Sequence, residues 1–168
     1  MDTRVHQDAG VRLLGAAAEA AGCARMMASS EPWLRLGRGY EDCLAVVSDP
    51  AKEVHVLHDE AGLAGFVVLD MRGVLRGYIQ SICVAPDRRA RGAGTELLGA
   101  AEERIFRDSP NVFLCVSSFN AGAQRFYARQ GYELVGRLQD FVVAGHDELL
   151  LRKSRGSWMT FRNARSEA

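Results

Sequence analysis

The chain has 168 residues, 48% of them hydrophobic, which is enough apolar material for the core of one domain over residues 1–168. Basic and acidic side chains balance at 21 each, so the broad basic field of a nucleic-acid-binding protein is excluded and no nucleic acid partner is expected. The first residues carry no signal-peptide pattern, and the Ala-rich stretch near residue 15 is too short and polar to span a bilayer. We therefore expect a cytoplasmic protein without a membrane partner.

Hydrophobic spacing predicts two N-terminal helices, followed by strands interleaved with further helices. Val11, Leu14 and Ala18 recur at helical spacing after a candidate cap at Asp8, whereas alternation after residue 53 indicates strands. In chain order the expected elements are helices at 8–29 and 32–49, strands at 53–59, 63–71 and 77–84, a helix at 91–107, a strand at 111–116, a helix at 121–130, and strands at 132–136 and 148–153 that form a hairpin around 141–147. Residues 154–168 are expected to be a loosely held C-terminal tail.

Cysteine and histidine usage argues against a metal site. The four histidines complete no zinc-like cluster, and the cysteines form no Cys-x-x-Cys pair. The cysteines are widely spaced in apolar contexts, at Cys23, Cys43, Cys83 and Cys115. We expect buried, reduced thiols that pack as small apolar groups, and no metal.

The segment 84–94, Val-Ala-Pro-Asp-Arg-Arg-Ala-Arg-Gly-Ala-Gly, joins an expected strand to an expected helix. The first turn of a helix has backbone N–H groups without intrahelical partners and carries partial positive charge, which favours anion binding. Gly92 and Gly94 lack a Cβ and let an anion approach the backbone closely. Full charges come from three arginines, Arg88, Arg89 and Arg91. The segment therefore predicts a diphosphate-binding loop.

Two other phosphate-binding motifs are excluded by single residues. A P-loop requires Lys directly after its second Gly, whereas Thr95 and Glu96 follow Gly94. A dinucleotide-binding fingerprint requires a third Gly three residues after the second, and that position holds Leu97.

The spacing Arg89-x-x-Gly92-x-Gly94 resembles the Q/R-x-x-G-x-G/A signature with which GNAT-superfamily N-acetyltransferases bind the pyrophosphate of acetyl-coenzyme A. A second segment, 118–132, resembles the N-x-x-A-x-x-F-Y-x-x-x-G-F/Y pattern of the same family, and the resemblance covers roughly residues 53–153. It implies an α/β (α+β) GNAT fold: a mixed, mostly antiparallel sheet of about six or seven strands with a splayed parallel pair, flanked by helices. It also implies acetyl-CoA as cosubstrate.

The resemblance assigns residues to cofactor binding. The strand before the loop would offer its backbone to the pantetheine arm, with the amide of Ile82 or its neighbour polarising the thioester carbonyl. Asn120, which also suits a helix N-cap, would contact the same arm. The full implied set is Ile82, Cys83, Val84, Arg89, Ala90, Arg91, Gly92, Ala93, Gly94, Thr95, Asn120 and Phe126.

Tyr127 is the expected catalytic residue. Carried over from the family pattern, its phenol would donate a proton to the departing coenzyme thiolate after direct attack by the amine in a ternary complex. The alternative is a core aromatic beside Phe126. Because adjacent helical side chains are about 100° apart, one ring can pack while the other faces the cleft.

The sequence leaves the general base open. The strand 78–84 has no carboxylate, and Cys83 has no nearby His that would make it a nucleophile. The candidates are Glu41, Asp42, Asp70, Asp140, His146 and Asp147, or a water relayed by Ser81 or Gln80.

The acceptor is expected to be a small primary amine, in a pocket with apolar walls from Trp33, Tyr40 and Phe141. Two alternatives stay open: a catalytically silent acyl-CoA-binding or regulatory module, and an enzyme that acetylates protein N-termini or lysines. Trp158, Met159 and Phe161 cluster in the polar tail, which favours a homodimer.

Overall fold

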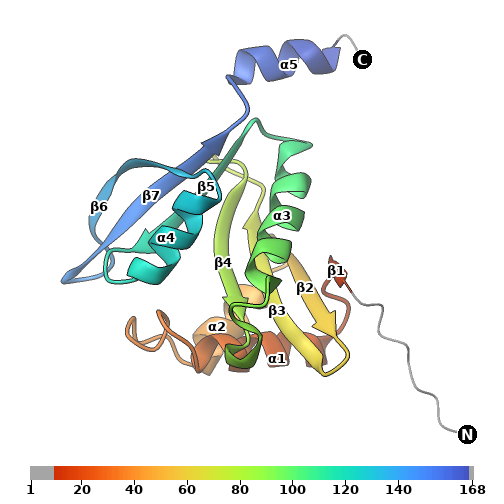
Figure 1. The fold of residues 1–168 in the computed structure, drawn as a ribbon, viewed down its shortest axis with the longest axis vertical. Coiled ribbons are helices and arrows are strands. Elements are labelled where there is room, and N and C mark those ends of the chain that lie inside the picture. Colours follow the sequence, from red (N-terminus) through yellow and green to blue (C-terminus); the bar gives the residue numbers. More distant parts are fainter. Residues whose placement is uncertain (1–9, 167–168) are drawn as a thin grey trace, which may run out of the picture.

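The computed structural model describes residues 10–166, in which one seven-stranded sheet is flanked by helices (Figure 1). The elements are β1 (Gly10–Leu13), α1 (Ala17–Ala28), α2 (Tyr40–Val47), β2 (Glu53–Asp59), β3 (Gly62–Asp70), β4 (Tyr78–Val84), the 3₁₀ turn η1 (Pro86–Arg88), α3 (Ala93–Phe106), β5 (Asn111–Ser117), α4 (Ala121–Arg129), β6 (Glu133–Val143), β7 (His146–Ser154) and α5 (Trp158–Ser166). The strand order is β1-β2-β3-β4-β5-β7-β6, and only the pair β4–β5 is parallel. No helix within residues 10–166 is long and apolar enough to cross a membrane.

Two apolar layers lie on opposite faces of the sheet. On one face α1 and α2 bury residues such as Met27 and Cys43 against Phe66 of β3. On the other face α3 and α4 pack through residues that include Leu97 and Tyr127. The expected mixed sheet flanked by helices is therefore confirmed.

The first expected helix is wrong at its start. Residues Gly10–Leu13 form strand β1, which pairs antiparallel with β2 from Gly10↔His58 to Leu13↔His55, and the helix begins only at Ala17. Helical spacing could not predict that this segment would pair with the free edge of β2. It also did not take account of Gly15, which disfavours a continuous helix. The candidate cap Asp8 lies outside the described residues.

The second expected helix is shorter than its pattern. Residues 31–37 form hydrogen-bonded turns, and α2 begins only at Tyr40. Gly37 has φ +68°, a left-handed conformation that ends helical continuity, and Asp42 Oδ2 accepts a hydrogen bond from the Gly39 amide at 3.2 Å at the new start. The segment between α1 and α2 is therefore a loop.

The C-terminal quarter is more ordered than expected. The hairpin strands β6 and β7 extend through most of the predicted turn, so that Phe141 lies on β6, although irregular pairing interrupts the ladder between Leu138 and Val143. The tail contains helix α5, in which the rings of Trp158 and Phe161 meet edge to face at 5.9 Å. Helix α5 was not predicted from the sequence, and its contacts with the rest of the chain include the ion pair of Arg165 with Asp108.

The parallel pair β4–β5 is short. Only Tyr78↔Phe113 and Ile79↔Leu114 are in register, and the strands diverge beyond them. At the closed end a Cβ on Gly77 would lie 2.6 Å from the Asn111 carbonyl oxygen, so only glycine permits this approach. The divergence opens the sheet at its centre.

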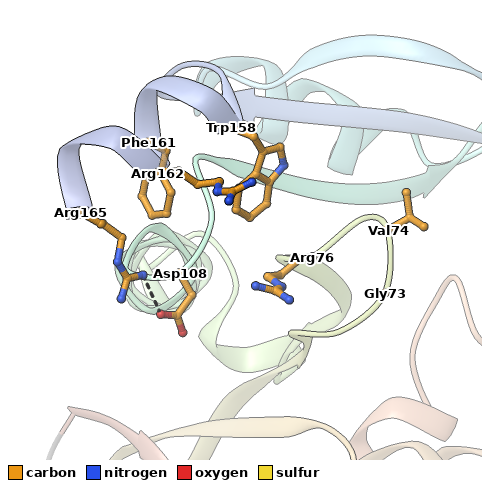
Figure 2. A pocket seen from close by; sticks show the side chains of 8 residues that line it. All are labelled: Gly73, Val74, Arg76, Asp108, Trp158, Phe161, Arg162 and Arg165. Carbon is orange, nitrogen blue, oxygen red and sulfur yellow. Dashed lines mark hydrogen bonds and ion pairs between the residues drawn. The ribbon is translucent and has the colours of Figure 1, made fainter.

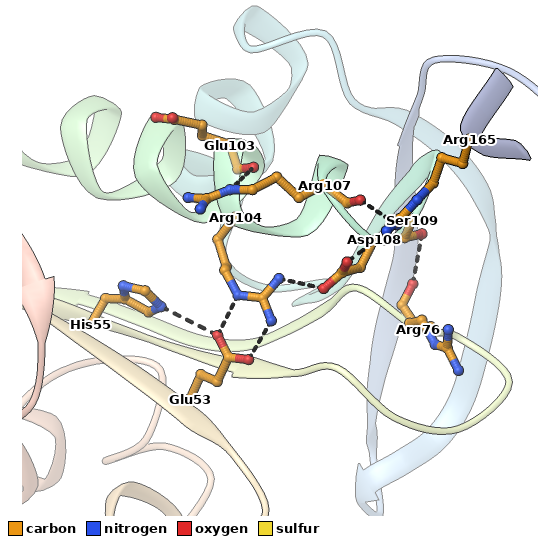
Figure 3. Close-up of polar contacts among 9 residues, drawn as sticks. All are labelled: Glu53, His55, Arg76, Glu103, Arg104, Arg107, Asp108, Ser109 and Arg165. Atoms are coloured by element: carbon orange, nitrogen blue, oxygen red, sulfur yellow. Dashed lines mark hydrogen bonds and ion pairs between the residues drawn. The ribbon is translucent and has the colours of Figure 1, made fainter. Parts of the chain in front are cut away.

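Charged contacts hold the C-terminal end of α3 in place (Figure 3). Arg104 donates from Nε and Nη2 to the two carboxylate oxygens of Glu53 on β2, at 2.7 and 2.6 Å, and from Nη1 to Asp108 at 2.7 Å. Asp108 also accepts a hydrogen bond from Arg165 of α5 at 3.3 Å. These contacts tie the C-terminal end of α3 to β2 and to α5.

Candidate active site

A cavity of about 1350 Å³ occupies the opening between β4 and β5. One end is lined by residues of the Arg- and Gly-rich loop and by the start of α3, and the wall beyond them carries residues of α4. The rest of the lining, called the acceptor end below, comes from the loop after α1, the β3–β4 connection and the β6–β7 hairpin. The sheet opening thus joins the predicted diphosphate loop to the predicted acceptor pocket.

Residues 89–94, called the anion cradle below, have a backbone geometry suited to binding an anion. Ala90 and Gly92 have positive φ, +60° and +91°, and Gly92 is the residue from which α3 starts. A Cβ at Gly94 would point at the ring of Phe126, 3.6 Å from its Cζ, so a larger side chain there would fill the cradle. These features fit the residues to a diphosphate at the helix N-terminus.

The three loop arginines are in different environments. Arg89 lines the cavity and donates to the Val84 carbonyl at 3.2 Å. Arg88 instead donates to Asp59 at 2.6 Å, at the end of β2, so the expectation that it adds charge to the cradle is wrong. Its ion pair forms because the β2–β3 turn brings a carboxylate beside η1. Arg91 is exposed and does not line the cavity.

Most of the other residues implied for the cofactor line this cavity. They are Ile82, Cys83, Val84, Ala90, Gly92, Gly94, Thr95, Asn120 and Phe126. Ala93 is instead packed in the core. Asn120 caps α4, because its Oδ1 accepts from the Ala123 amide at 3.1 Å, which leaves its NH₂ group for another partner.

Tyr127 has both of the environments considered for it. Its ring meets Phe126 and Tyr132 edge to face at 5.2 and 5.6 Å and is only 6% exposed, yet it also lines the cavity. Burial raises the pKa of Tyr127 well above the usual range. Within residues 10–166 no hydrogen bond to its hydroxyl is found, so this group is available to a bound molecule.

The thiol of Cys83 is not set up as a nucleophile. Cys83 is buried, and the burial raises its pKa to about 11. The pKa-lowering contacts with Ser30 and Arg89 are weaker than this effect. At neutral pH it is therefore a thiol and not a thiolate.

Only some of the residues expected to bind or deprotonate the acceptor line the cavity. Trp33 and Phe141 line the cavity, whereas Tyr40 does not. Of the candidate bases, Asp70 lines it, as do Gln80 and Ser81, the residues expected to relay a water. The others do not, namely Glu41, Asp42, Asp140, His146 and Asp147.

Glu148 lines the cavity and was missed as a candidate. It is 5% exposed, and Ser117 Oγ donates to its Oε1 at 2.6 Å. Burial raises the pKa of Glu148, an effect that the Ser117 hydrogen bond and nearby His146 partly offset. The available signal was a carboxylate at the start of the apolar run Leu149–Leu151, since a charged side chain is rarely buried without a role.

A second, smaller pocket of about 550 Å³ lies under α5 (Figure 2). Arginines, including Arg76 and Arg165, gather there around Trp158 and Phe161, and Asp108 is paired with Arg165. It contains none of the residues implied for the cofactor or for catalysis.

Residues 16–132 match the model of the Acetyltransferase (GNAT) family, and this match spans more than half of the chain. The chain belongs to the GNAT family. A solved structure from Desulfovibrio desulfuricans, assigned to the same family, is 20% identical to this GNAT chain with a TM-score of 0.73, over 86% of this chain and 98% of that one. An aminoglycoside 6'-N-acetyltransferase complexed with coenzyme A is 14% identical with a TM-score of 0.71, over 86% and 96%. These two show the shared fold.

Nourseothricin acetyltransferase has a higher identity over a shorter part of this GNAT chain. It is 32% identical with a TM-score of 0.58, over 64% of this chain and 68% of its own. A search of curated proteins found no match to the sequence.

Proposed function

We propose that the chain is an N-acetyltransferase that moves the acetyl group of acetyl-CoA to a primary amine by direct attack in a ternary complex. The observation that carries the proposal is the continuous cavity between β4 and β5. It joins an anion cradle at the start of α3, a wall bearing Tyr127, and an end lined by carboxylates. Cofactor, reacting group and amine would then share one cavity.

The cofactor roles follow from this arrangement. Amides of the segment 89–95, with the Arg89 side chain, would hold the diphosphate at the helix N-terminus. The backbone of 82–84, left without a parallel partner where β5 diverges, would pair with the pantetheine arm. Asn120 would add a hydrogen bond from its free NH₂ group. The one residue that we assign to acid catalysis is Tyr127, because its unpaired hydroxyl borders the cavity.

We infer that the acceptor is a small cationic amine. Glu31, Asp70 and Glu148 all line the acceptor end and would attract an ammonium group, while Trp33 and Phe141 give it apolar walls. The 32% identity to nourseothricin acetyltransferase supports a small-molecule acceptor. The two alternative functions, a catalytically silent binding module and a protein acetyltransferase, are distinguished by the experiment that follows.

The proposal is tested by thiol release from acetyl-CoA with a panel of spermidine, L-lysine, kanamycin, nourseothricin and an N-terminal alanine peptide. We expect turnover with at least one of the small amines. Coenzyme binding without turnover on any member would overturn the enzyme assignment, and turnover on the peptide alone would overturn the small-molecule acceptor.

Tyr127→Phe keeps the ring and removes the hydroxyl, so turnover should fall roughly 10²–10⁴-fold while coenzyme affinity stays unchanged. Tyr132→Phe is the matched control, because Tyr132 is equally buried beside Tyr127 but does not line the cavity. Equal turnover of the two variants would return Tyr127 to a packing role.

We also propose a homodimer in which α5 contributes to the contact. Met159 is 66% exposed on this helix, and Trp158 is partly exposed beside it. Figure 1 shows α5 standing apart from the other helices. Exposed Trp and Met side chains of this kind are favoured at protein interfaces.

A further inference from the structure

We propose that Glu148 is the general base that takes the proton from the attacking amine, with Ser117 as its positioning residue. This assignment rests on the proposed acetyl transfer. It names the general base, a role for which the strand 78–84 offers no carboxylate.

Strand pairing places Glu148 beside the opened part of the sheet. β7 pairs with β5 in register, so that Ser117 stands opposite Glu148 and Cys115 opposite Leu150. Ser117 Oγ donates to Oε1 at 2.6 Å, and Oε2 accepts no hydrogen bond from residues 10–166. Because Glu148 lines the cavity, its second oxygen is left for a group bound there.

The surroundings of Glu148 make it a base and not half of an ion pair. Tyr78 of β4 and Cys115 of β5 are its titratable neighbours across the opening, and burial raises the pKa of both. They are therefore neutral at pH 7. From β6, the residue paired with Glu148 is the apolar Leu138, and His146 on β7 is the nearby group that favours the carboxylate form.

The other carboxylates near this end are more open to water than Glu148. Asp70 accepts a hydrogen bond from the Arg72 amide at 3.0 Å, and Glu31 accepts one from the Arg35 amide at 3.3 Å. Asp147, next in sequence, is paired with Arg137 at 2.8 Å and does not line the cavity. Lys52, a cation of the cavity wall, donates to Gln80.

The chemistry balances with these two side chains. An ammonium ion bound beside Glu148 gives one proton to Oε2, and the nitrogen lone pair then forms the bond to the thioester carbonyl carbon. The C–S bond breaks with its electron pair on sulfur, which takes a proton from the Tyr127 hydroxyl, and the second N–H proton is lost from the new amide nitrogen to solvent. Proton return from water to Tyr127, and loss from Glu148, completes the cycle.

Glu148→Gln preserves the shape of the side chain and the possibility of a hydrogen bond from Ser117 but removes the base. At pH 7 its kcat/KM should be about 10²–10³-fold lower, measured with the panel amine that turns over fastest. Asp147→Asn is the matched control, since it removes the same charge one position away, and its kcat/KM should stay within about threefold of the parent. Coenzyme A affinity should be unchanged in both.

The pH profile separates a base from a merely structural carboxylate. Between the pKa of Glu148 and that of the amine, the parent profile should be nearly flat, because a bound ammonium ion loses its proton inside the site. Glu148→Gln can use only amine that arrives neutral, so its kcat/KM should rise about tenfold per pH unit below the amine pKa. Ser117→Ala removes a hydrogen bond that lowers the pKa of Glu148, and should move the acid limb of the parent profile to higher pH.

Each outcome decides something. A parent protein that binds coenzyme A but turns over no amine overturns the proposed function, and the role of Glu148 with it. A parent that turns over, with a folded Glu148→Gln variant of parental rate or parallel pH profile, overturns the role of Glu148 alone. Equal losses in Asp147→Asn and Glu148→Gln would assign the effect to the electrostatic field of the hairpin, and would also overturn it.

Discussion

Gly94→Asp separates anion binding from folding, because the two should respond in opposite directions. Gly94 is the second residue of α3, where a negative side chain complements the helix dipole by about 0.3–1 kcal/mol. An added Cβ would have its nearest neighbours at 3.6 Å (Phe126 Cζ) and 3.8 Å (Val84 Cγ2), which are ordinary contacts. The variant should therefore melt at the same temperature as the parent or slightly higher.

The same carboxylate should greatly weaken coenzyme A binding, because Gly94 lines the cavity and its Cβ would lie beside Phe126 and Val84, which also line it. Two unit charges about 5 Å apart repel by roughly 3 kcal/mol at an effective dielectric constant of about 20. Since about 1.4 kcal/mol corresponds to a tenfold change, affinity should fall by about 100-fold or more.

Titration calorimetry with coenzyme A, alongside thermal melting, measures both effects. Gly99→Asp is the matched control, because Gly99 lies on the same helix with open space around its Cβ position, and its affinity should stay within about threefold of the parent. Gly94→Ala adds the methyl group without the charge. A folded Gly94→Asp variant of parental affinity would refute the placement of the diphosphate at α3.

Two further predictions concern stability and assembly. Hydrogen bonding from Arg12 lowers the pKa of Glu19 to about 2 from 4.5, so its contribution to the free energy of unfolding is complete above pH 4.5 and is lost as the pH falls toward 2. Urea unfolding across that range should be less pH-dependent in Glu19→Gln, and an unchanged slope would contradict the ion pair. In light scattering, the full chain at tens of micromolar should have twice the mass of one chain, and removal of residues 154–168 should weaken that dimer; a monomeric full chain would contradict the dimer.

The expectations that held were those carried by contiguous residues. The sequence predicted the strands at 53–59 and 77–84 and the helix after Gly92. Alternation, helical spacing and a glycine turn are all patterns of residues that lie close together in the chain. The position of the Arg- and Gly-rich loop before α3 was predictable for the same reason, since the loop and the helix N-terminus adjoin in the chain, while the binding of a diphosphate there stays a prediction. The expectation that failed at residues 10–13 depended on a partner, because this segment became a strand where β2 offered a free edge. Helix α5 was missed although its contact between Trp158 and Phe161 is local.

The sequence by itself determined the fold class, through the resemblance of two short segments to the GNAT family, and predicted the loop at which a diphosphate would bind. Both signals lie in residues that are neighbours in the chain. Tertiary structure alone decided which charged groups face the cavity. Arg88 forms an ion pair with Asp59, 29 positions away, and not with a group of the cradle. Glu148 accepts a hydrogen bond from Ser117, 31 positions away, beside the opening. The physical reason is that burial and hydrogen bonding set the state of a carboxylate, and both depend on which strands become neighbours in the sheet.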